Sequence, residues 1–529
     1  MRRVTLGICC AVMALSLPSL AAARTATVTS FDHTRIHVNF FSAAGLRAGK
    51  RAPTVMMGPG WGSAGDTNPN DSAVPSLGTV GVGTLRHAGF NVLTWDPRGF
   101  GKSGGTVEVD SPAYEGRDVS AMITWLSRQP QALLDHPGDP RVGMAGGSYG
   151  GAIQLVAAAI DRRIDAIVPD IAWNSLITSL DKNGIGKLGW SGLLYLAGNA
   201  AGRLNPIIGQ GYEADVAGQP VTAAERAFFA SRGPGSLVGR IRIPTLLIQG
   251  TADNLFTLQE AVTNYELLRR HGVPVKMLWF CGGHGICLTN PGDTGLIAKD
   301  TIAWLDRYLK RETNVRTGPV FQWVDQNGRE RTGADYPLAA AAPLTASGAG
   351  MLPLTPAGGS GPVSPDPAAG PLGVAAASIT PAKAQNAVNV IVRPPTKVRL
   401  VVGAPQVTLT YRGLPGAGSP AHTAVFAQVV DDATGKLLGN QVTPIPITLD
   451  GASHRISEPL EILSATDRPG QQFTLQIVAS TVAYDTQRAT GAVQLSKIRI
   501  VLPTVDPSAK PPGYGVANPA AAAAAAAGS

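Results

Sequence analysis

The sequence predicts an α/β domain with a mostly parallel sheet, followed by a smaller all-β sandwich. Up to about residue 310, short buried apolar runs alternate with amphipathic helical patterns, which is typical of a parallel sheet covered by helices. Beyond about residue 385, apolar runs of strand length are separated by turn residues, which is typical of a sandwich. A strand, a glycine-rich turn and a helix at 141–160 form the centre of the first domain, because the turn presents a serine.

Composition limits the class of protein. The chain has 529 residues, 15% of them charged, with 63 glycines and 41 prolines, so loop-rich α/β and all-β domains fit better than a helical bundle. The net charge of +8 is not gathered into a basic cluster or interleaved with aromatic residues, which argues against a nucleic-acid partner. Because the sequence has no metal-ligand spacing, phosphate loop or cofactor motif, we expect neither a metal nor a cofactor.

Residues 1–23 are predicted to be a signal peptide. Arg2 and Arg3 precede the apolar run 4–17, and Ala21-Ala22-Ala23 offers a small-residue site for cleavage after Ala23. The run is short for a membrane span, so we expect a secreted or cell-envelope protein with no stable membrane span after processing. An uncleaved anchor is the alternative, and the arginine pair leaves the export route open.

The α/β domain is expected over 25–330. Its first segment, 25–42, alternates as a β-hairpin, and buried strands are predicted at 52–57 and 89–95. A helix is predicted at 114–129, because apolar residues recur there at helical spacing.

Residues 143–151 read Gly-Met-Ala-Gly-Gly-Ser-Tyr-Gly-Gly and contain a G-x-S-x-G around Ser148. The run 141–145 before it can form a buried strand, and 152–160 after it is a good helix former. Such a nucleophile elbow holds the serine in a strained backbone conformation, with small residues where the strand and helix nearly touch. A glycine-rich turn with a surface serine is the alternative. A dinucleotide-binding turn does not fit, because no register supplies G-x-G-x-x-G.

A helical cap is expected at about 170–240, between strands at 164–169 and 243–249. Helical fragments, glycines and aromatic residues follow one another there without a strand. An insertion at this point would lie over the carboxyl ends of the sheet strands. Candidates for a substrate pocket beneath it are Trp173, Trp190 and Tyr195. The alternative is that they pack the cap's own small core.

Asp253 and His284 complete a candidate catalytic set with Ser148. Asp253 follows one predicted strand, and His284 follows the strand at 275–280, which we expect to be the last of the sheet before a closing helix at 294–309. The chain order Ser, Asp, His is that of α/β-hydrolases. We therefore predict Ser148 as nucleophile, His284 as general base and Asp253 as the acid that orients it, with unconnected loop residues as the alternative.

Two backbone N–H groups are expected to hold the oxyanion. The N–H of Tyr149 lies at the start of the helix after the nucleophile, where the helix dipole favours negative charge. The second donor is expected in the loop 58–62, Gly-Pro-Gly-Trp-Gly, where Trp61 offers its N–H. An ordinary Gly/Pro loop is the alternative.

The segment after the first domain changes composition. Residues 340–385 are rich in Ala, Pro and Gly and almost uncharged, so we expect a linker or a loosely held cover. A jelly-roll-like sandwich is expected over 386–505 and a disordered tail over 506–529. Its predicted strands are 397–402, 406–411, 423–430, 473–478 and 495–501.

Three motifs carry a resemblance to a known family: Asp96-Pro97-Arg98-Gly99-x-Gly101-x-Ser103-x-Gly105, Ile123-Thr124-Trp125-Leu126-x-x-Gln129-Pro130 and the glycine-rich turn 143–151. They resemble the cocaine-esterase and X-prolyl dipeptidyl-peptidase (CocE/NonD-like) family of serine hydrolases. The resemblance spans roughly 25–505, is strong around Ser148 and is architectural beyond about 385. It implies an α/β-hydrolase domain, a non-catalytic C-terminal jelly roll and a peptide or acyl-ester substrate. Some members place a tyrosine hydroxyl in the oxyanion hole, and the loop 58–62 has no tyrosine.

These observations predict a secreted serine hydrolase that cleaves an ester or peptide bond through an acyl-enzyme, either X-Pro dipeptidyl-peptidase-like or acyl-esterase-like. A dipeptidyl-peptidase needs groups that hold a free amino terminus, and the sequence does not locate such a pair. The alternative is a surface- or wall-binding protein whose sandwich is the functional part.

Cys281 and Cys287 are predicted to form a disulfide. They are the two cysteines that remain after removal of the signal peptide, and they flank His284 at C-x₅-C. Export implies an oxidising compartment, where an even pair tends to close. Two free thiols are the alternative.

Overall fold

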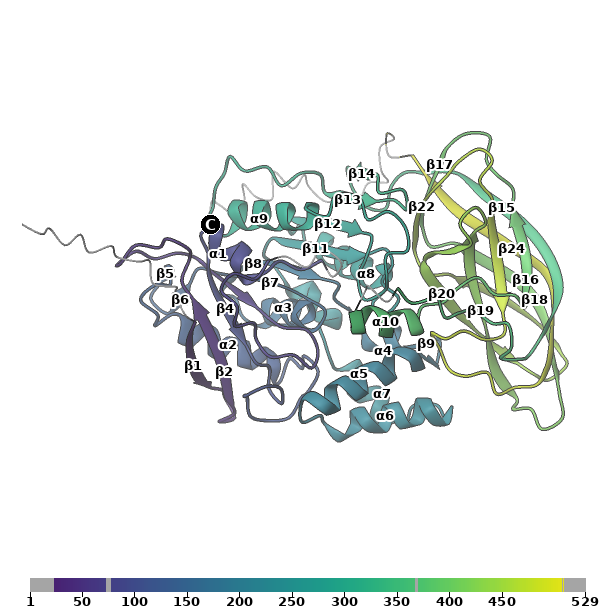
Figure 1. Ribbon diagram of the computed structural model, residues 1–529, viewed down its shortest axis with the longest axis horizontal. Coiled ribbons are helices and arrows are strands. Elements are labelled where there is room, and N and C mark those ends of the chain that lie inside the picture. The colour runs from purple at the N-terminus through teal and green to yellow at the C-terminus, as the bar shows by residue number, and fades with distance from the viewer. Residues whose placement is uncertain (1–22, 73–77, 367–369, 507, 509–529) are drawn as a thin grey trace, which may run out of the picture.

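The structure is a computed structural model that describes residues 23–72, 78–366, 370–506 and 508. It consists of an α/β unit with a helical cap, and a C-terminal unit of antiparallel β-sheets that lies beside both (Figure 1). The predicted fold class, an α/β-hydrolase domain with a helical insertion followed by an all-β domain, is confirmed. The predicted signal peptide, apart from Ala23, and nearly all of the predicted tail lie outside the described residues.

A ten-stranded sheet forms the centre of the α/β unit, in the order β1-β2-β4-β3-β7-β8-β11-β12-β13-β14. Strands β3, β4, β7, β8, β11, β12 and β13 run parallel. Strands β2 and β14 run antiparallel to them, and the edge strand β1 pairs antiparallel with β2. The bounds are β1 Arg24–Thr29, β2 Arg35–Phe41, β3 Thr54–Met57, β4 Asn91–Trp95, β7 Val142–Gly147, β8 Ile164–Asp170, β11 Thr245–Gly250, β12 Val275–Phe280, β13 Phe321–Val324 and β14 Glu330–Gly333. A small hairpin, β5 Leu134–His136 with β6 Asp139–Pro140, precedes β7.

Helices cover both faces of this sheet because successive residues of its buried strands face opposite sides. Val55 and Val92 belong to a core with α1 and α9, whereas the next residues, Met56 and Leu93, belong to a core with α2, α3 and α8. The bounds of these helices are α1 Val82–His87, α2 Glu115–Leu126, α3 Tyr149–Ile160, α8 Leu258–Arg269 and α9 Leu296–Tyr308.

The cap lies between β8 and β11, as predicted. It consists of α4 Leu176–Leu180, α5 Leu188–Ala201, α6 Pro206–Ala217, α7 Ala223–Ala230 and the 3₁₀-helix η2 Gly235–Arg240. The expectation that it contains no strand was wrong, because β9 Asp181–Lys182 and β10 Ile185–Gly186 pair as a minimal hairpin. Two-residue strands leave no periodic pattern in a sequence.

The C-terminal unit is built from two antiparallel sheets around a common apolar core. One sheet has the order β21-β18-β24-β17-β22, with β15 also paired to β24, and the other has the order β16-β23-β19-β20. The bounds are β15 Ala340–Pro353, β16 Ala387–Val392, β17 Arg399–Gly403, β18 Gln406–Pro415, β19 His422–Asp431, β20 Lys436–Thr448, β21 Ser453–Pro459, β22 Leu463–Asp467, β23 Phe473–Val478 and β24 Gly491–Val505. The predicted sandwich strands correspond to β17, β18, β19, β23 and β24.

Two expectations about the region between the units were wrong. The predicted linker 340–385 begins with the 14-residue strand β15, which pairs along β24, and it also contains the helix α10 Gly370–Ser378. Strand β12 does not end the large sheet, because β13 pairs parallel to it and β14 follows. In both cases pairing with a strand distant in sequence decides the structure.

Contacts join the two units into one body. Buried Glu461 of the C-terminal unit lies 2.5 Å from Lys182 Nζ of the cap and 2.8 Å from Thr257 Oγ1 of the α/β unit. Gln326, just after β13, donates to Thr466 O of β22 at 2.7 Å and accepts from Thr466 N–H at 2.8 Å. The cap therefore lies against the sandwich as well as over the sheet (Figure 1).

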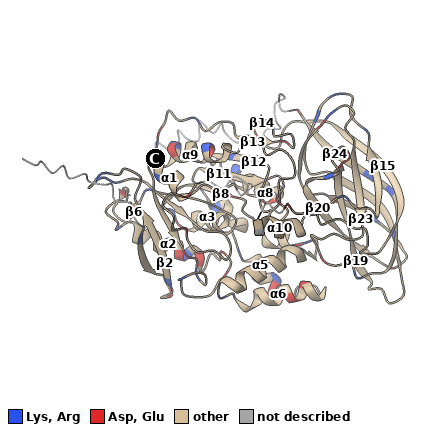
Figure 2. Ribbon diagram, in the orientation of Figure 1, with Lys and Arg blue, Asp and Glu red and all other residues tan. Residues whose placement is uncertain are grey.

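Charged residues of both signs are interspersed over the ribbon, most of which carries uncharged residues (Figure 2). Among the described residues, no helix is long and apolar enough to cross a membrane.

Candidate active site

Ser148 stands on a tight turn between β7 and α3. Its backbone has φ 58° and ψ −119°, a region that residues other than glycine rarely adopt. Close packing around the turn maintains this backbone conformation and requires glycine on both sides of Ser148. A Cβ at Gly150 would lie 2.1 Å from Gly58 O, and a Cβ at Gly146 would lie 2.8 Å from the same oxygen. The Ser148 N–H donates to Asp170 O at the end of β8, at 2.9 Å. Strand, turn and helix thus adopt the nucleophile-elbow geometry that the glycine pattern predicts.

His284 connects Ser148 with Asp253. Its Nε2 lies 2.7 Å from Ser148 Oγ, and its Nδ1 lies 2.8 Å from Asp253 Oδ2. Asp253 is completely buried, whereas 11% of the His284 side chain is exposed. The three predicted residues therefore form one continuous hydrogen-bonded chain, although they come from three separate loops at the carboxyl ends of β7, β11 and β12.

The loop that carries Asp253 is held by its own backbone. Asp253 Oδ1 accepts the N–H groups of Leu255 at 3.0 Å and Phe256 at 2.9 Å. The side chain of Gln249, on β11, donates to Phe256 O at 2.6 Å. These hydrogen bonds fix the orientation of the carboxylate toward His284.

Donors from the cap and the C-terminal unit hold the same loop from outside. Lys187, which is buried in the cap, donates to Asn254 O at 2.9 Å and Leu255 O at 3.0 Å. Burial lowers the pKa of Lys187 to about 8. Gln441 on β20 donates to Asp253 O at 2.9 Å. Sequence reasoning missed Lys187 and Gln441, because no motif marks a side chain that binds a distant backbone carbonyl.

The His284 loop is also tied to β20. Asn440 donates to Ile286 O at 2.7 Å, and Lys436 Nζ donates to Leu288 O. The glycines beside His284 let two loops approach closely, because a Cβ at Gly283 would lie 2.6 Å from the Asp253 side chain. Strand β20 thus contacts the loops of both Asp253 and His284.

The disulfide Cys281–Cys287 is present, which confirms that prediction. It joins the end of β12 to the residues after His284. The two rings that pack edge-on against the imidazole are Phe256, at a centroid distance of 5.0 Å, and Trp190, at 5.8 Å.

The two predicted oxyanion donors lie on neighbouring segments. The loop 58–62 approaches the elbow through Gly58 and Gly150, as the glycine contacts above show. Among the described residues, neither the Trp61 N–H nor the Tyr149 N–H has a hydrogen-bond acceptor. The Trp61 indole is already engaged, because Nε1 donates to Leu194 O at 2.8 Å. Backbone rather than indole N–H groups therefore remain available at this position.

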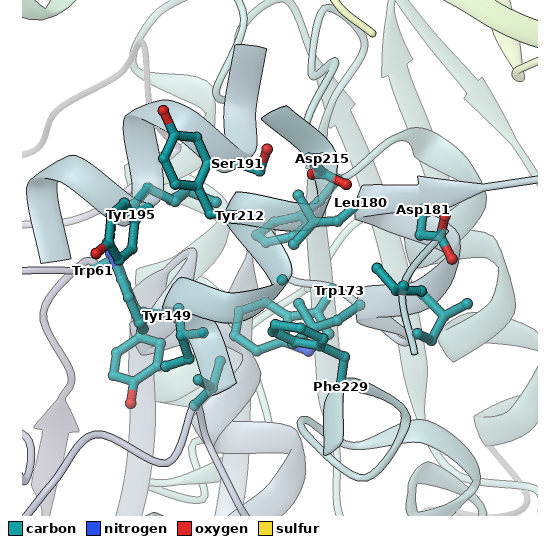
Figure 3. Close-up of a pocket in the computed structure, with 18 of the residues that line it drawn as sticks. Trp61, Tyr149, Trp173, Leu180, Asp181, Ser191, Tyr195, Tyr212, Asp215 and Phe229 are labelled. Carbon is teal, nitrogen blue, oxygen red and sulfur yellow. Dashed lines mark hydrogen bonds between the residues drawn. The ribbon is translucent and has the colours of Figure 1, made fainter. Parts of the chain in front are cut away.

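A pocket of about 900 Å³, partly open to solvent, lies beside Ser148 (Figure 3). Its walls include Trp61, Tyr149, Trp173 and Tyr195. Two of the three predicted pocket residues, Trp173 and Tyr195, therefore line it. Trp190 is not among the described residues that line it, so that prediction was wrong. Its ring packs on His284 and its Nε1 donates to Asn254 Oδ1 at 3.0 Å.

Buried acids lie close to the elbow. Asp170, whose carbonyl accepts the Ser148 N–H, has no hydrogen-bond partner for either carboxyl oxygen among the described residues, and burial raises its pKa well above the ordinary value. The Tyr149 hydroxyl lies 3.5 Å from Glu115 Oε1, and burial raises the pKa of Glu115 to about 7. In the described ranges, no group of three or more His, Cys, Asp or Glu side chains is arranged to hold a metal ion.

Comparison with known proteins agrees with this geometry. Residues 32–285, which contain all three residues of the hydrogen-bonded chain, match the family described as X-Pro dipeptidyl-peptidase (S15 family). The α/β domain belongs to the S15 family. It is an X-Pro dipeptidyl-peptidase-like α/β-hydrolase domain, and members of this family are serine hydrolases that act as peptidases or esterases.

Solved structures share the architecture of the whole chain. A CocE/NonD family hydrolase from Staphylococcus aureus superposes with a TM-score of 0.66 at 14% identity, over 91% of this chain and 93% of the other. An α-amino acid ester hydrolase gives a TM-score of 0.68 at 15% identity, over 92% and 96% of the two chains. An aminopeptidase from a marine sediment Thaumarchaeota archaeon gives 0.68 at 14% identity, over 94% and 99%. At such identities the similarity shows the fold alone.

Curated relatives match over shorter stretches. A putative Xaa-Pro dipeptidyl-peptidase of Rhodopirellula baltica is 26% identical over 309 residues, which is 52% of this chain and 47% of that protein. A polyketide transferase of Gibberella fujikuroi is 30% identical over 115 residues, which is 22% of this chain and 32% of that protein. The matches thus span less than half the length of these relatives.

Proposed function

We propose that this chain is a serine hydrolase that cleaves an ester or amide bond through an acyl-enzyme on Ser148. The observation that carries the proposal is the hydrogen-bonded chain from Asp253 through His284 to Ser148, with the serine on a strained elbow. Ser148 Oγ attacks the carbonyl carbon while His284 Nε2 takes the hydroxyl proton and then delivers it to the leaving group. Asp253 keeps the proton on Nδ1 and stabilises the imidazolium. Water then releases the acyl group by the same steps in reverse.

The N–H groups of Tyr149 and Trp61 are proposed to hold the oxyanion. Both are free of other acceptors among the described residues, and the loop 58–62 lies against the elbow. Removal of one such donor typically costs about 3 kcal/mol of transition-state stabilisation. In this proposal the Trp61 N–H is the second donor, in place of the tyrosine hydroxyl that some family members use.

An X-Pro dipeptidyl-peptidase activity is the second candidate. Asp215 lines the pocket, where Ser191 hydrogen-bonds to it and no ion pair holds it among the described residues, so a substrate amino group could pair with it. Burial raises the pKa of Asp215 to about 6, so it is mostly ionised at neutral pH. An acyl-ester activity requires no such partner.

Fluorophosphonate labelling of the purified protein tests the proposal. We expect the wild type to label and Ser148→Ala not to label, because the probe reacts with an activated serine. A folded wild type that never labels would contradict the proposal and favour a binding protein whose C-terminal unit is the working part.

Export with removal of residues 1–23 is a further part of the proposal. It is supported by the disulfide, which is typical of oxidising compartments, and by β1, which begins at Arg24 directly after the expected cleavage site. N-terminal sequencing of the mature protein should begin at Arg24. A mature protein that keeps residue 1 would contradict cleavage.

A further inference from the structure

The pocket beside Ser148 has walls of one chemical kind over most of its extent. Aromatic rings follow one another around the serine: Trp61 packs on Tyr149 at a centroid distance of 5.3 Å, and Trp173 packs on Phe256 at 4.9 Å. Beyond these rings the cap supplies aliphatic and aromatic side chains from α4, α5, α6 and α7, among them Leu194. The lining runs from Ser148 into all four α-helices of the cap.

The position of this pocket relative to His284 decides which part of a substrate enters it. The leaving group must lie where His284 Nε2 can protonate it. The pocket is lined by Ser148, Tyr149 and Trp61, whereas His284 is not among its described lining residues. Phe256, which lines the pocket, stands edge-on against the imidazole, as does Trp190 outside the described lining. Next to Ser148 the pocket is thus lined by the two residues that carry the proposed oxyanion donors, and we assign it to the acyl group, which stays bonded to Ser148 after the leaving group departs.

Charged groups are confined to one part of the pocket. Asp181 and Asp215 lie at the upper right of Figure 3, away from Tyr149 and Trp61 at its left. Asp181 is already paired with Arg226 of α7 at 2.5 Å. The part next to Ser148 offers a substrate neither a charge nor a line of hydrogen-bond donors, so binding there depends on burial of apolar surface.

From this arrangement we propose that the substrate carries a large apolar acyl group, of the size of an octanoyl chain or larger, which the pocket beneath the cap receives. The inference rests on the proposed function, because the acyl group is defined by its bond to Ser148. It excludes the acetyl group as the preferred acyl group, since two carbons would leave most of the apolar wall in contact with water. It also excludes a proline ring as the optimal acyl-side group, because that ring is small for the pocket.

A series of p-nitrophenyl esters tests the proposal on the wild-type protein. The acetate, butanoate and octanoate differ in acyl length alone, and each is used below the concentration at which it forms micelles. Full burial of one methylene is worth about a fourfold change in affinity. We expect kcat/KM to rise at least about tenfold from butanoate to octanoate, because burial along the pocket is partial.

Two variants on one helix localise the effect. Leu194→Trp fills the pocket from α5 and is expected to lower the octanoate-to-butanoate ratio of kcat/KM at least about tenfold. Leu196, two residues further on α5, is 61% exposed and does not belong to the described pocket lining. Leu196→Trp should keep the wild-type ratio. An equal loss of the ratio in both variants would overturn the assignment to this pocket.

The outcomes separate this inference from the proposed function. Ser148-dependent hydrolysis that is fastest on the acetate ester, or faster on an X-Pro p-nitroanilide than on the octanoate ester, overturns the inference and leaves the serine hydrolase intact. Absence of both ester hydrolysis and fluorophosphonate labelling overturns the proposed function and the inference with it. The wild-type series decides the question even if Leu194→Trp does not fold.

Discussion

Gln441 offers the sharpest test of whether the C-terminal unit takes part in catalysis. This side chain is 4% exposed and lies on β20, yet its Nε2 donates to the carbonyl of Asp253 at 2.9 Å. Gln441→Ala leaves that buried carbonyl without its donor, which typically costs about 1–3 kcal/mol. Part of this cost should appear in the transition state, because Asp253 must stay aligned with His284 as the imidazolium forms.

We expect kcat of Gln441→Ala to fall about tenfold, which corresponds to about 1.4 kcal/mol, while KM changes little. KM should be preserved because Gln441 is not among the described residues that line the pocket. The assay is steady-state hydrolysis of an activated ester, combined with the rate of fluorophosphonate labelling. The labelling rate should fall in parallel with kcat, because it reports the reactivity of Ser148.

Gln428→Ala is the matched control. Gln428 is 1% exposed, and its amide contacts Gln476 Oε1 at 2.9 Å, Ala382 O and Ser360 Oγ, all within the C-terminal unit. This variant should lose comparable stability in chemical denaturation and keep the wild-type kcat. If Gln441→Ala also keeps the wild-type kcat at a similar loss of stability, the C-terminal unit does not position Asp253.

Four further predictions follow from the site and its surroundings. Ser148→Ala and His284→Ala should each lower turnover of an activated ester at least about a thousandfold, and near-wild-type turnover in either folded variant would contradict the triad. Calorimetry of the full chain should show one cooperative transition, because contacts such as Glu461 with Lys182 join the two units, and two well-separated transitions would refute this. Asp170→Asn should stabilise the protein increasingly as pH rises above about 4, by up to about 1.4 kcal/mol per pH unit. The pKa of Asp170 is raised in the folded wild type, so above about pH 4 this group ionises in the unfolded chain first, and ionisation there favours unfolding. If wild type and Asp170→Asn show the same dependence of unfolding free energy on pH, the prediction is contradicted. Mass spectrometry after alkylation without reductant should find Cys281 and Cys287 unmodified, and the double serine variant should lose about 2–3 kcal/mol of unfolding free energy; two alkylated cysteines would exclude the bridge.

The sequence predicted those parts of the site that local chain geometry determines. Ser148 was found because a nucleophile elbow needs glycines at fixed positions in the sequence. Asp253 and His284 were found because the carboxyl ends of parallel strands meet at one edge of a sheet, so residues after successive strands lie near one another. The cysteine pair was found because residues 24–529 contain no other cysteine that could pair with either thiol.

The parts that sequence reasoning missed depend on contacts between distant segments. Strand β15 is built largely from Ala, Gly and Pro, which are depleted in strands, and its pairing with β24 determines its structure. Trp190 was expected in the pocket with Trp173. The sequence of a cap does not indicate which neighbour an aromatic side chain will face. In the structure it packs on His284.

The Asp253 loop shows why the whole chain contributes to a site that three residues define. Its backbone carbonyls at Asp253, Asn254 and Leu255 accept donors from Gln441 of the C-terminal unit and Lys187 of the cap. Neither donor belongs to the sheet that carries the loop. A loop outside helices and strands has no regular backbone hydrogen bonds for its carbonyl groups, so donors to its buried carbonyls must come from other elements. The cap and the C-terminal unit supply these donors, and the cap also forms the wall of the pocket. A change of cap that moves both Lys187 and the pocket wall is therefore expected to alter the alignment of Asp253 together with the fit of a substrate.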